Sequence, residues 1–315
     1  MDLLFVADPI ESFKIYKDST FTMMREAQGR GHRVWVCEPR DLSWRSGTRV
    51  QAQVQELHLT GEESPWYDVR SRTTWALHQF DAVVMRKDPP FDSEFFYATH
   101  LLGQAEREGA RVFNKPAALR DHPEKLAIME CPEFLSPTLV TRSELQVREF
   151  HAEHRDIILK PLDGMGGMGI FRVGPDGLNL GAIIETLQRD GAQTIMVQRY
   201  VPAIAQGDKR VLVIGGKPVP YALARIPQGG EVRGNLAAGG KGVAQALSAR
   251  DLDIATTLGP RLFERGLLLV GLDVIGDCLT EINVTSPTCF REIMDQTGFD
   301  VAAMFLDALE QALHA

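Results

Sequence analysis

The sequence lacks the features that mark several specialised classes of protein. Its 315 residues include four cysteines, none in a Cys-x-x-Cys spacing, which argues against a zinc knuckle and a disulfide framework. No apolar run approaches the ~18 residues of a membrane-spanning helix. The apolar stretch at residues 1–7 is short, carries the acidic Asp2 at its start and runs directly into Asp8 and Pro9, unlike a cleaved signal. We therefore expect reduced thiols, a first strand near residues 3–7, no membrane contact and a cytoplasmic location.

Long stretches of positive charge are also absent. The formal net charge is -8, and no run of Lys and Arg supplies the basic face that a nucleic-acid binder needs. The eight histidines show no metal-ligand spacing, and His151 with His154 fits a polar helix face better. With 44% hydrophobic and 24% charged residues, the composition is that of an ordinary globular protein. The length suggests two or three subdomains.

Strand and helix patterns alternate through the first third of the chain. The expected strands cover residues 3–7, 33–37, 81–86 and 111–114, and the expected helices cover residues 19–28 and 93–109. Residues 43–79 are polar and less regular. The alternation predicts a parallel α/β sheet, whose ligands gather beyond the carboxyl ends of its strands. Arg86 lies at such an end.

A glycine cluster at residues 164–169 has the spacing Gly-x-Gly-x-x-Gly, which alone indicates a dinucleotide-binding crossover. Its context favours another structure. Residues 156–161 before it and 170–173 after it both have strand patterns, whereas a dinucleotide fingerprint opens a helix. We predict a hairpin loop whose backbone N–H groups, together with Lys160, bind a polyphosphate. A merely flexible hairpin is the alternative.

Other elements are expected around this loop. Asp121 is expected to cap a short helix that carries Lys125. Further on, the pattern predicts a helix at residues 180–189, strands at 194–199 and 221–226, and a hairpin at 209–219.

Residues 227–242 contain six glycines together with Arg233 and Lys241. Long irregular loops within compact domains are usually lids or disordered segments. A glycine-rich lid that carries an arginine can close over a charged reaction centre. We therefore predict a lid, and a solvent-exposed linker is the alternative.

Asp273 and Glu281 interrupt two apolar strands expected between residues 267 and 284. Buried carboxylates are costly unless they are paired or bind a cation, and Asn283 shares the face of Glu281. A three-residue loop at 276–278 would place Asp273 directly across from Glu281, whereas a two-residue turn would separate them. We predict that the three side chains bind Mg²⁺. A solvated edge hairpin is the alternative.

Hydroxyl, backbone N–H and guanidinium groups that could bind an anionic substrate are expected close to the predicted metal site. Residues 285–288 supply hydroxyl and backbone N–H groups directly after the predicted metal strand. Arg210, Arg225 and Arg233 are expected near the same cleft, and guanidinium groups match carboxylate and phosphate oxygens in bidentate geometry. An ordinary turn and isolated surface charges are the alternatives.

The order of these features resembles that of the ATP-grasp enzymes. The chain has first a lysine, then a glycine loop, then a lid and finally a strand that carries carboxylates. Several segments are similar to the bacterial glutathione synthetase family, and these are residues 85–92, 114–116, 158–167, 207–213, 224–240 and 280–288. The resemblance covers nearly the whole chain. It implies an α/β fold, α+β overall, in which an ATP-grasp fold follows a Rossmann-like parallel α/β domain. The implied division is an N-terminal domain of residues 1–120, a central subdomain of 121–200, and a C-terminal subdomain of 201–315 with the lid at 227–242.

The same resemblance implies roles for individual residues. ATP would contact Lys125, Lys160, Gly164, Gly166, Gly167, Gln198, Arg199, Tyr200, Val201 and Asp208. Mg²⁺ or Mn²⁺ would bind to Asp273, Glu281 and Asn283. Catalysis would use Arg210, Arg225, Arg233 and Asn235, and the substrate would contact Arg86, Ser286 and Thr288. The family also implies a homotetramer.

The implied reaction joins γ-glutamylcysteine to glycine. The cysteinyl carboxylate would attack the γ-phosphate of ATP, and the amine of glycine would then displace phosphate. Metal and arginines would stabilise the transfer, and a closed lid would protect the acyl phosphate from water. Two alternatives remain at this stage: an ATP-grasp ligase for a different carboxylate or amine, and a nucleotide-binding module without chemistry.

Overall fold

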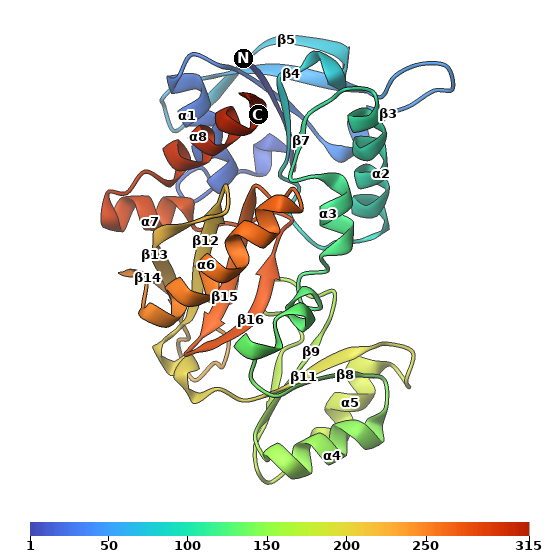
Figure 1. Cartoon of the computed structure of the whole chain (residues 1–315), viewed down its shortest axis with the longest axis vertical. Helices are drawn as coiled ribbons and strands as arrows, with labels where there is room; N and C mark the ends of the chain where they lie inside the picture. The colour runs from blue at the N-terminus through green and yellow to red at the C-terminus, as the bar shows by residue number, and fades with distance from the viewer. Residues whose placement is uncertain (315) are drawn as a thin grey trace.

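The computed structural model describes residues 1–314 and contains three β-sheets covered by helices (Figure 1). A seven-stranded sheet, built from the first part of the chain, lies at the top of the view. A five-stranded sheet lies in the middle and a four-stranded sheet at the bottom. All four cysteines are free thiols. Within residues 1–314, no helix is both long and apolar enough to cross a membrane.

The seven-stranded sheet has the expected parallel centre. β1 (Asp2–Val6) pairs in parallel with β2 (Arg33–Cys37) and β6 (Ala82–Met85), and β6 pairs in parallel with β7 (Val112–Phe113). The connections include α1 (Ser19–Gly29) and α2 (Ser93–Arg107). The carboxylates of Asp18 and Asp92 accept hydrogen bonds from Phe21 N and Phe95 N, so each helix has an N-cap. The Rossmann-like prediction is confirmed.

Residues 43–79 do not form an irregular stretch, and this interpretation was wrong. β4 (Gln51–Leu59) and β5 (Tyr67–Ala76) form a long antiparallel hairpin, with β3 (Leu42–Ser43) also paired to β4. β5 lies on the outside of the sheet and none of its residues is fully buried. Its hydrophobic signal is weak because only one of its faces packs on protein.

The prediction that Asp121 caps a helix carrying Lys125 was also wrong. Asp121 is the last residue of α3 (Pro116–Asp121), and Lys125 lies in the turn that follows. Pro116 occupies the first turn of α3, where the N–H that proline lacks has no helical partner in any case. The remaining short helices are 3₁₀ turns at Ile10–Ser12, Pro39–Asp41, Leu77–Gln79, Ala127–Glu130, Pro132–Phe134, Pro202–Gln206 and Leu236–Ala238.

The four-stranded sheet is antiparallel throughout, in the order β10-β9-β11-β8. Its strands are β8 (Thr138–Thr141), β9 (Ile157–Pro161), β10 (Phe171–Val173) and β11 (Ile195–Arg199). α4 (Glu144–His154) and α5 (Leu180–Gln188) cover it, and together they enclose a separate small core. Because β9 and β10 pair antiparallel, the glycine cluster joins two strands of a hairpin, as predicted.

The five-stranded sheet is also antiparallel, in the order β14-β13-β12-β15-β16. Its strands are β12 (Asp208–Ile214), β13 (Lys217–Ile226), β14 (Lys241–Ala246), β15 (Leu269–Ile275) and β16 (Cys278–Asn283). α6 (Ala249–Glu264) packs on β12, β13 and β15. α7 (Phe290–Thr297) and α8 (Val301–His314) return the chain to α1, which joins this sheet to the N-terminal part.

Candidate active site

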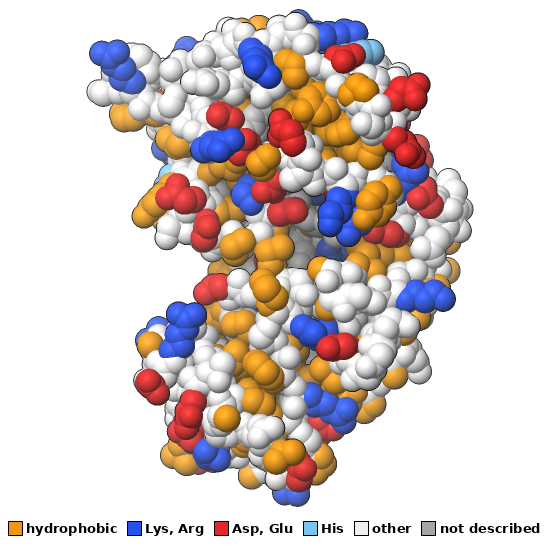
Figure 2. Space-filling model, turned by 180° about the vertical axis from the view of Figure 1, so that it is seen from behind, with side chains coloured by type: hydrophobic (Ala, Val, Ile, Leu, Met, Phe, Trp, Pro, Cys, Tyr) orange, Lys and Arg blue, Asp and Glu red, His pale blue; other side chains and the backbone are white. Residues whose placement is uncertain are grey.

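A cavity of about 460 Å³ is lined by residues from all three parts of the fold. In the view from behind, the surface is hollowed between the upper and lower parts of the molecule (Figure 2). Fifteen of the twenty residues predicted for the site line this cavity: Arg86, Lys125, Lys160, Gly164, Gly166, Gly167, Asp208, Arg210, Arg225, Asn235, Asp273, Glu281, Asn283, Ser286 and Thr288. Gln198, Arg199, Tyr200, Val201 and Arg233 are not among the lining residues.

One basic and two acidic side chains form a row across one face of the five-stranded sheet. Arg210 on β12 is directly opposite Asp273 on β15, which is directly opposite Glu281 on β16. Residues that face each other across antiparallel strands project from the same side. The Arg210 Nε donates to Asp273 Oδ1 at 2.6 Å and its Nη2 donates to Oδ2 at 3.2 Å. The row is therefore set by strand register.

A β-bulge puts Glu281 in this row. Ile275 pairs with Cys278, so the turn has two residues and the predicted three-residue loop was wrong. Thr280 is an extra residue between the Val274–Leu279 and Asp273–Glu281 pairs. Such an insertion restores the register that the short turn would have shifted. The predicted placement of Asp273 across from Glu281 is therefore confirmed, although by a different backbone route.

Arg225 and Asp208 extend the charged face toward β13. They are opposite each other in the strand pairing, and Arg225 Nη2 lies 2.6 Å from Asp208 Oδ2 and 2.8 Å from Asp273 Oδ2. Burial raises the pKa of Asp208 to about 6, although Arg225 opposes this. Burial also disfavours the charge on Asp273, but Arg210 and Arg225 outweigh it and hold the pKa of Asp273 far below its ordinary value. Asp273 is therefore an anion between two guanidinium groups.

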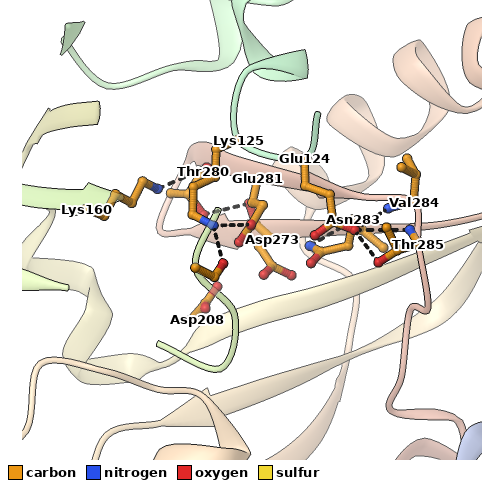
Figure 3. A network of polar contacts seen from close by, with 12 residues as sticks. Glu124, Lys125, Lys160, Asp208, Asp273, Thr280, Glu281, Asn283, Val284 and Thr285 are labelled. Carbon is orange, nitrogen blue, oxygen red and sulfur yellow. Dashed lines mark hydrogen bonds and ion pairs between the residues drawn. The ribbon is translucent and has the colours of Figure 1, made fainter. Parts of the chain in front are cut away.

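Two buried lysines approach the same acids from other elements (Figure 3). Lys125 Nζ lies 3.1 Å from Glu281 Oε1 and donates to the carbonyl oxygen of Gly164 at 2.7 Å. Lys160, on β9, donates to the carbonyl oxygen of the bulge residue Thr280 at 3.3 Å. Burial lowers the pKa of Lys160, although Glu281 opposes this. Two cations beside a glycine-rich loop form a site suited to a polyphosphate.

Family models match this chain along most of its length. The model described as the prokaryotic glutathione synthetase N-terminal domain matches residues 1–120, and the model of the ATP-grasp domain of the same family matches residues 124–298. The chain belongs to the prokaryotic glutathione synthetase family.

Relatives named glutathione synthetase are similar over almost their whole length. The protein of Ralstonia nicotianae is 62% identical, covering 99% of this chain and 96% of the relative. The proteins of Neisseria meningitidis serogroup B and Pseudomonas aeruginosa are 56% and 52% identical, each covering 98% of both chains. The solved structures include D-cycloserine synthetase DcsG, with a TM-score of 0.67, 17% identity and 99% of both chains covered. The ATP-grasp ligase PsnB has a TM-score of 0.62 at 19% identity, covering 98% of both chains, and both likenesses bear out the ATP-grasp fold.

Two loops meet beside the cavity of this glutathione synthetase family member. Arg233 Nη1, in loop 227–242, donates to the carbonyl oxygen of Gly167 at 3.5 Å. Gly167 has a φ of +83°, which favours glycine, and a Cβ atom there would lie 2.7 Å from Asn235 Oδ1 and displace that side chain. Asn235, Leu236 and Ala237 line the cavity. The loop therefore packs against the glycine loop, while its last residues, from Lys241, already belong to β14.

Glu124 is a buried acid of the site that the sequence interpretation missed. Its Oε1 accepts hydrogen bonds from Val284 N at 3.0 Å, from Thr285 N at 3.1 Å and from Thr285 Oγ1 at 2.8 Å (Figure 3). Burial raises the pKa of Glu124, and the negative charge of Glu281 adds to this. The contacts tie the turn that carries Lys125 to the end of β16. The acidic residue beside that lysine was the only sequence signal.

Arg86 links the carboxyl end of β6 to the loop after β16. Its Nε donates to Thr20 Oγ1 and its Nη2 donates to the carbonyl oxygen of Pro287, both at 3.0 Å. Ser286 Oγ donates to the carbonyl oxygen of Arg86 at 3.4 Å. The predicted position of Arg86 beside residues 285–288 is therefore present in the structure.

The predicted adenine segment lies at the end of β11. Gln198 is buried and donates through Nε2 to Thr138 Oγ1 at 3.0 Å. The guanidinium group of Arg172 lies over the ring of Tyr200, 3.7 Å from its centroid. Arg199 is exposed. The ATP contacts assigned to residues 198–201 stay predictions, because these side chains do not line the cavity.

Proposed function

We propose that this chain is an ATP-dependent ligase that joins γ-glutamylcysteine to glycine, giving glutathione, ADP and phosphate through an acyl phosphate. Relatives that carry the name glutathione synthetase, 52–62% identical over almost the whole chain, support the proposal. The observation that carries it is the charged row from Arg210 through Asp273 to Glu281, with Lys125 and Lys160 beside it. Such a row can hold an anionic substrate beside nucleotide phosphates.

The two strand arginines would orient the reacting carboxylate. Arg210 and Arg225 are almost fully buried, and guanidinium groups bind carboxylate oxygens in a fixed planar geometry. Held there, the cysteinyl carboxylate of the dipeptide can attack the γ-phosphate of ATP in line. A carboxylate does not lose oxide at neutral pH, so the phosphate is needed as the group that glycine displaces.

The lysines and the glycine loop would bind the nucleotide phosphates. Lys125 and Lys160 supply two buried positive charges, and the backbone N–H groups of residues 164–167 can approach phosphate oxygens closely. Loop 227–242 would close over the reaction, because an acyl phosphate is destroyed by water. Arg233 and Asn235 are the polar residues that this loop brings to the cavity edge.

Mg²⁺, or Mn²⁺, would bind at Glu281 and Asn283. Among residues 1–314, no three His, Cys, Asp or Glu side chains gather into a metal cluster. This suits Mg²⁺, which usually takes one or two protein carboxylates and completes its shell with water and substrate phosphates. Asn283 Nδ2 donates to the carbonyl oxygen of Gly271 at 3.2 Å, which leaves its amide oxygen available as a ligand. The ion would neutralise the charge that develops on the phosphates.

Asp273 fits this metal set only through a change of partners. Both of its carboxylate oxygens accept from arginines in the structure. As a ligand it would exchange some of these contacts for the cation. We propose Glu281 and Asn283 as the primary protein ligands and Asp273 as the group that connects them to the arginines.

The domain division follows the same proposal. The seven-stranded sheet falls within residues 1–120, the four-stranded sheet within 121–200 and the five-stranded sheet within 201–315. A homotetramer is proposed from the family resemblance alone, and a cytoplasmic location stays the prediction made above from the sequence. Size-exclusion chromatography with light scattering tests the first of these.

An ADP-formation assay tests the reaction. With ATP and Mg²⁺, we expect ADP only when γ-glutamylcysteine and glycine are both present, and glutathione in equal amount by mass spectrometry. Equal ADP formation with unrelated dipeptides would favour an ATP-grasp ligase of different specificity. No ADP with any carboxylate would indicate a binding module without chemistry.

A further inference from the structure

β16 is the last strand of the five-stranded sheet, and in the described part of the chain no further strand pairs with its outer side. The peptide groups along a free strand edge need other partners when they are buried. The central subdomain supplies them. Lys160 Nζ donates to the carbonyl oxygen of Thr280, and the carbonyl oxygen of Glu124 accepts from Ile282 N at 3.0 Å. The edge of the strand that carries Glu281 is thus completed from another part of the fold.

Glu124 continues this edge beyond the end of the strand. Its Oε1 atom accepts from Val284 N, Thr285 N and Thr285 Oγ1, at 3.0, 3.1 and 2.8 Å (Figure 3). The other carboxylate oxygen takes part in none of these contacts. Residues 282–285 therefore donate to a single residue, once to its carbonyl oxygen and three times to Oε1.

Val284 is bound at both of its peptide groups. Its N–H donates to Glu124, and its carbonyl oxygen accepts from Asn114 Nδ2 at 2.9 Å. Asn114, directly after β7, also donates to the carbonyl oxygen of Leu269 at 2.8 Å and accepts from Leu269 N at 3.0 Å. Asn114 thereby fixes the end of β16 to the N-terminal sheet and to the start of β15. Glu124 ties its own segment to this fixed point.

Lys125 is the next residue in the chain and depends on this attachment. It lies in a turn, between the end of α3 and the 3₁₀ helix that follows, and its Nζ is 3.1 Å from Glu281 Oε1. Because Glu124 precedes Lys125 and Ile282 follows Glu281, the hydrogen bond between Glu124 and Ile282 sets the separation of the lysine from the acid. Asn283, the other proposed metal ligand, is flanked on both sides by residues that donate to Glu124.

We infer that Glu124 is a positioning residue that sets the nucleotide-binding Lys125 against the metal-binding end of β16, as a hydrogen-bond acceptor rather than through its charge. The inference rests on the proposed function for the roles of Lys125, Glu281 and Asn283. Mg²⁺ and the lysine must meet oxygens of the same phosphate chain, so their relative position decides how far one favours the binding of the other. A displaced turn would leave both groups present but no longer matched.

The measurement is nucleotide binding without turnover. Calorimetric titration with the non-hydrolysable ATP analogue AMP-PNP, in Mg²⁺ and in EDTA, gives two values of Kd. Their ratio is the factor by which the metal tightens nucleotide binding. We expect Glu124→Ala to lower this factor about tenfold, because two peptide N–H groups and one hydroxyl lose their acceptor.

Glu124→Gln separates the acceptor from the charge. Its amide oxygen can take the place of Oε1, with the amide nitrogen at the position of the other oxygen, so the factor should stay within about twofold of the wild-type value. Thr285→Val removes one of the three donors at nearly constant volume and should lower the factor by less than Glu124→Ala does. It provides the same comparison if Glu124→Ala does not fold.

Glu108→Ala is the matched control. Glu108 Oε2 accepts from Val50 N at 2.7 Å, which is also a carboxylate contact with distant backbone, but Glu108 does not line the cavity. Both alanine variants should lower the thermal unfolding midpoint. Only Glu124→Ala should lower the Mg²⁺ factor, whereas a purely structural role of Glu124 would move the midpoint and leave the factor unchanged.

Three results would overturn the inference. The first is a wild-type factor in Glu124→Ala and Thr285→Val. The second is a loss in Glu124→Gln as large as in Glu124→Ala, which would assign the effect to charge. The third is an equal loss in Glu108→Ala, which would indicate general destabilisation. Wild-type protein whose AMP-PNP binding does not depend on Mg²⁺ would also overturn it, and ADP formation with γ-glutamylcysteine and glycine reports separately on the proposed function.

Discussion

The arginines around the cavity are held in two different ways. Arg210 and Arg225 project from neighbouring strands, are 6% and 4% exposed, and both pair with Asp273. Arg233 projects from loop 227–242, and its ion pair is with Glu231, only two residues away. Strand register fixes the first two before any ligand binds, whereas the loop arginine depends on how its loop is placed. The comparison suggests a preorganised sheet for orienting charge and a loop for enclosing it.

Glu281→Gln tests the sheet half of this comparison and should have the largest effect. The change removes a negative charge from the row at nearly constant volume. We expect kcat to fall about a hundredfold or more, with a higher Mg²⁺ concentration needed for half-maximal rate. The thermal unfolding midpoint should stay close to that of the wild type. Glu264→Gln, on the exposed side of α6, is the control, and wild-type activity in Glu281→Gln would remove the metal assignment.

The sequence predicted those parts of the fold whose burial leaves a clear pattern. β1, β6 and the hairpin around the glycine cluster have apolar runs bounded by turn residues, and α1 and α2 begin where expected. β5 was missed because its outward face is polar. The short helix α3 was misplaced because Asp121 can serve as a cap in sequence, while Pro116 starts the helix earlier.

Some residues of the site could be predicted from the sequence and others could not. Hydrophobic patterns identified Asp273 and Glu281 as acids within apolar strands. The turn between them was assigned wrongly, because one inserted residue, Thr280, has no hydrophobic signature. Glu124 was missed because its partners Val284 and Thr285 lie some 160 positions later in the chain. Contacts of this range follow from the tertiary fold and leave no local pattern.

Gly271→Ala sharpens the comparison by displacing one strand arginine without removing it. A Cβ atom at this position would lie 2.8 Å from Arg210 Cδ and 3.1 Å from Nε, so the guanidinium group must move. Losing charge-assisted hydrogen bonds of this kind should raise KM for the dipeptide about ten- to a hundredfold. Gly29→Ala, which would meet no atom within 4 Å, is the control. An unchanged KM would show that the arginine position is not critical.

Arg233→Ala tests the loop half and should have a smaller effect. Arg233 contacts Gly167 through a single long hydrogen bond, so we expect the substitution to lower kcat by up to about tenfold. Limited proteolysis should cut wild-type protein within residues 227–242 when no ligand is present, and ATP with dipeptide should protect it. Protection should be weaker in the variant. Arg45→Ala, in another exposed loop, is the control, and cleavage that ligands do not affect would contradict closure.

Asp208→Asn tests whether the buried charges on the five-stranded sheet lower the stability of the fold. Its expected effect is on the free energy of unfolding. Burial raises the pKa of Asp208 from its ordinary 3.8 to about 6. Between these pH values the unfolded chain ionises this carboxyl group while the folded chain keeps the proton. Wild-type stability attributable to Asp208 is therefore full below about pH 4 and is lost as the pH rises through 6. Asparagine does not titrate, so the variant escapes this loss.

The measurement is the free energy of unfolding in denaturant, without ligands, at several pH values from 4 to 7. We expect the difference between Asp208→Asn and wild type to move in the variant's favour by about 1–3 kcal/mol as the pH rises from 4 to 6, and to level off above that. Glu231→Gln, at the exposed loop partner of Arg233, should show no such movement. A constant difference, or a change of opposite sign, would mean that the strand charges carry no such cost, and the contrast between sheet and loop would lose its energetic basis.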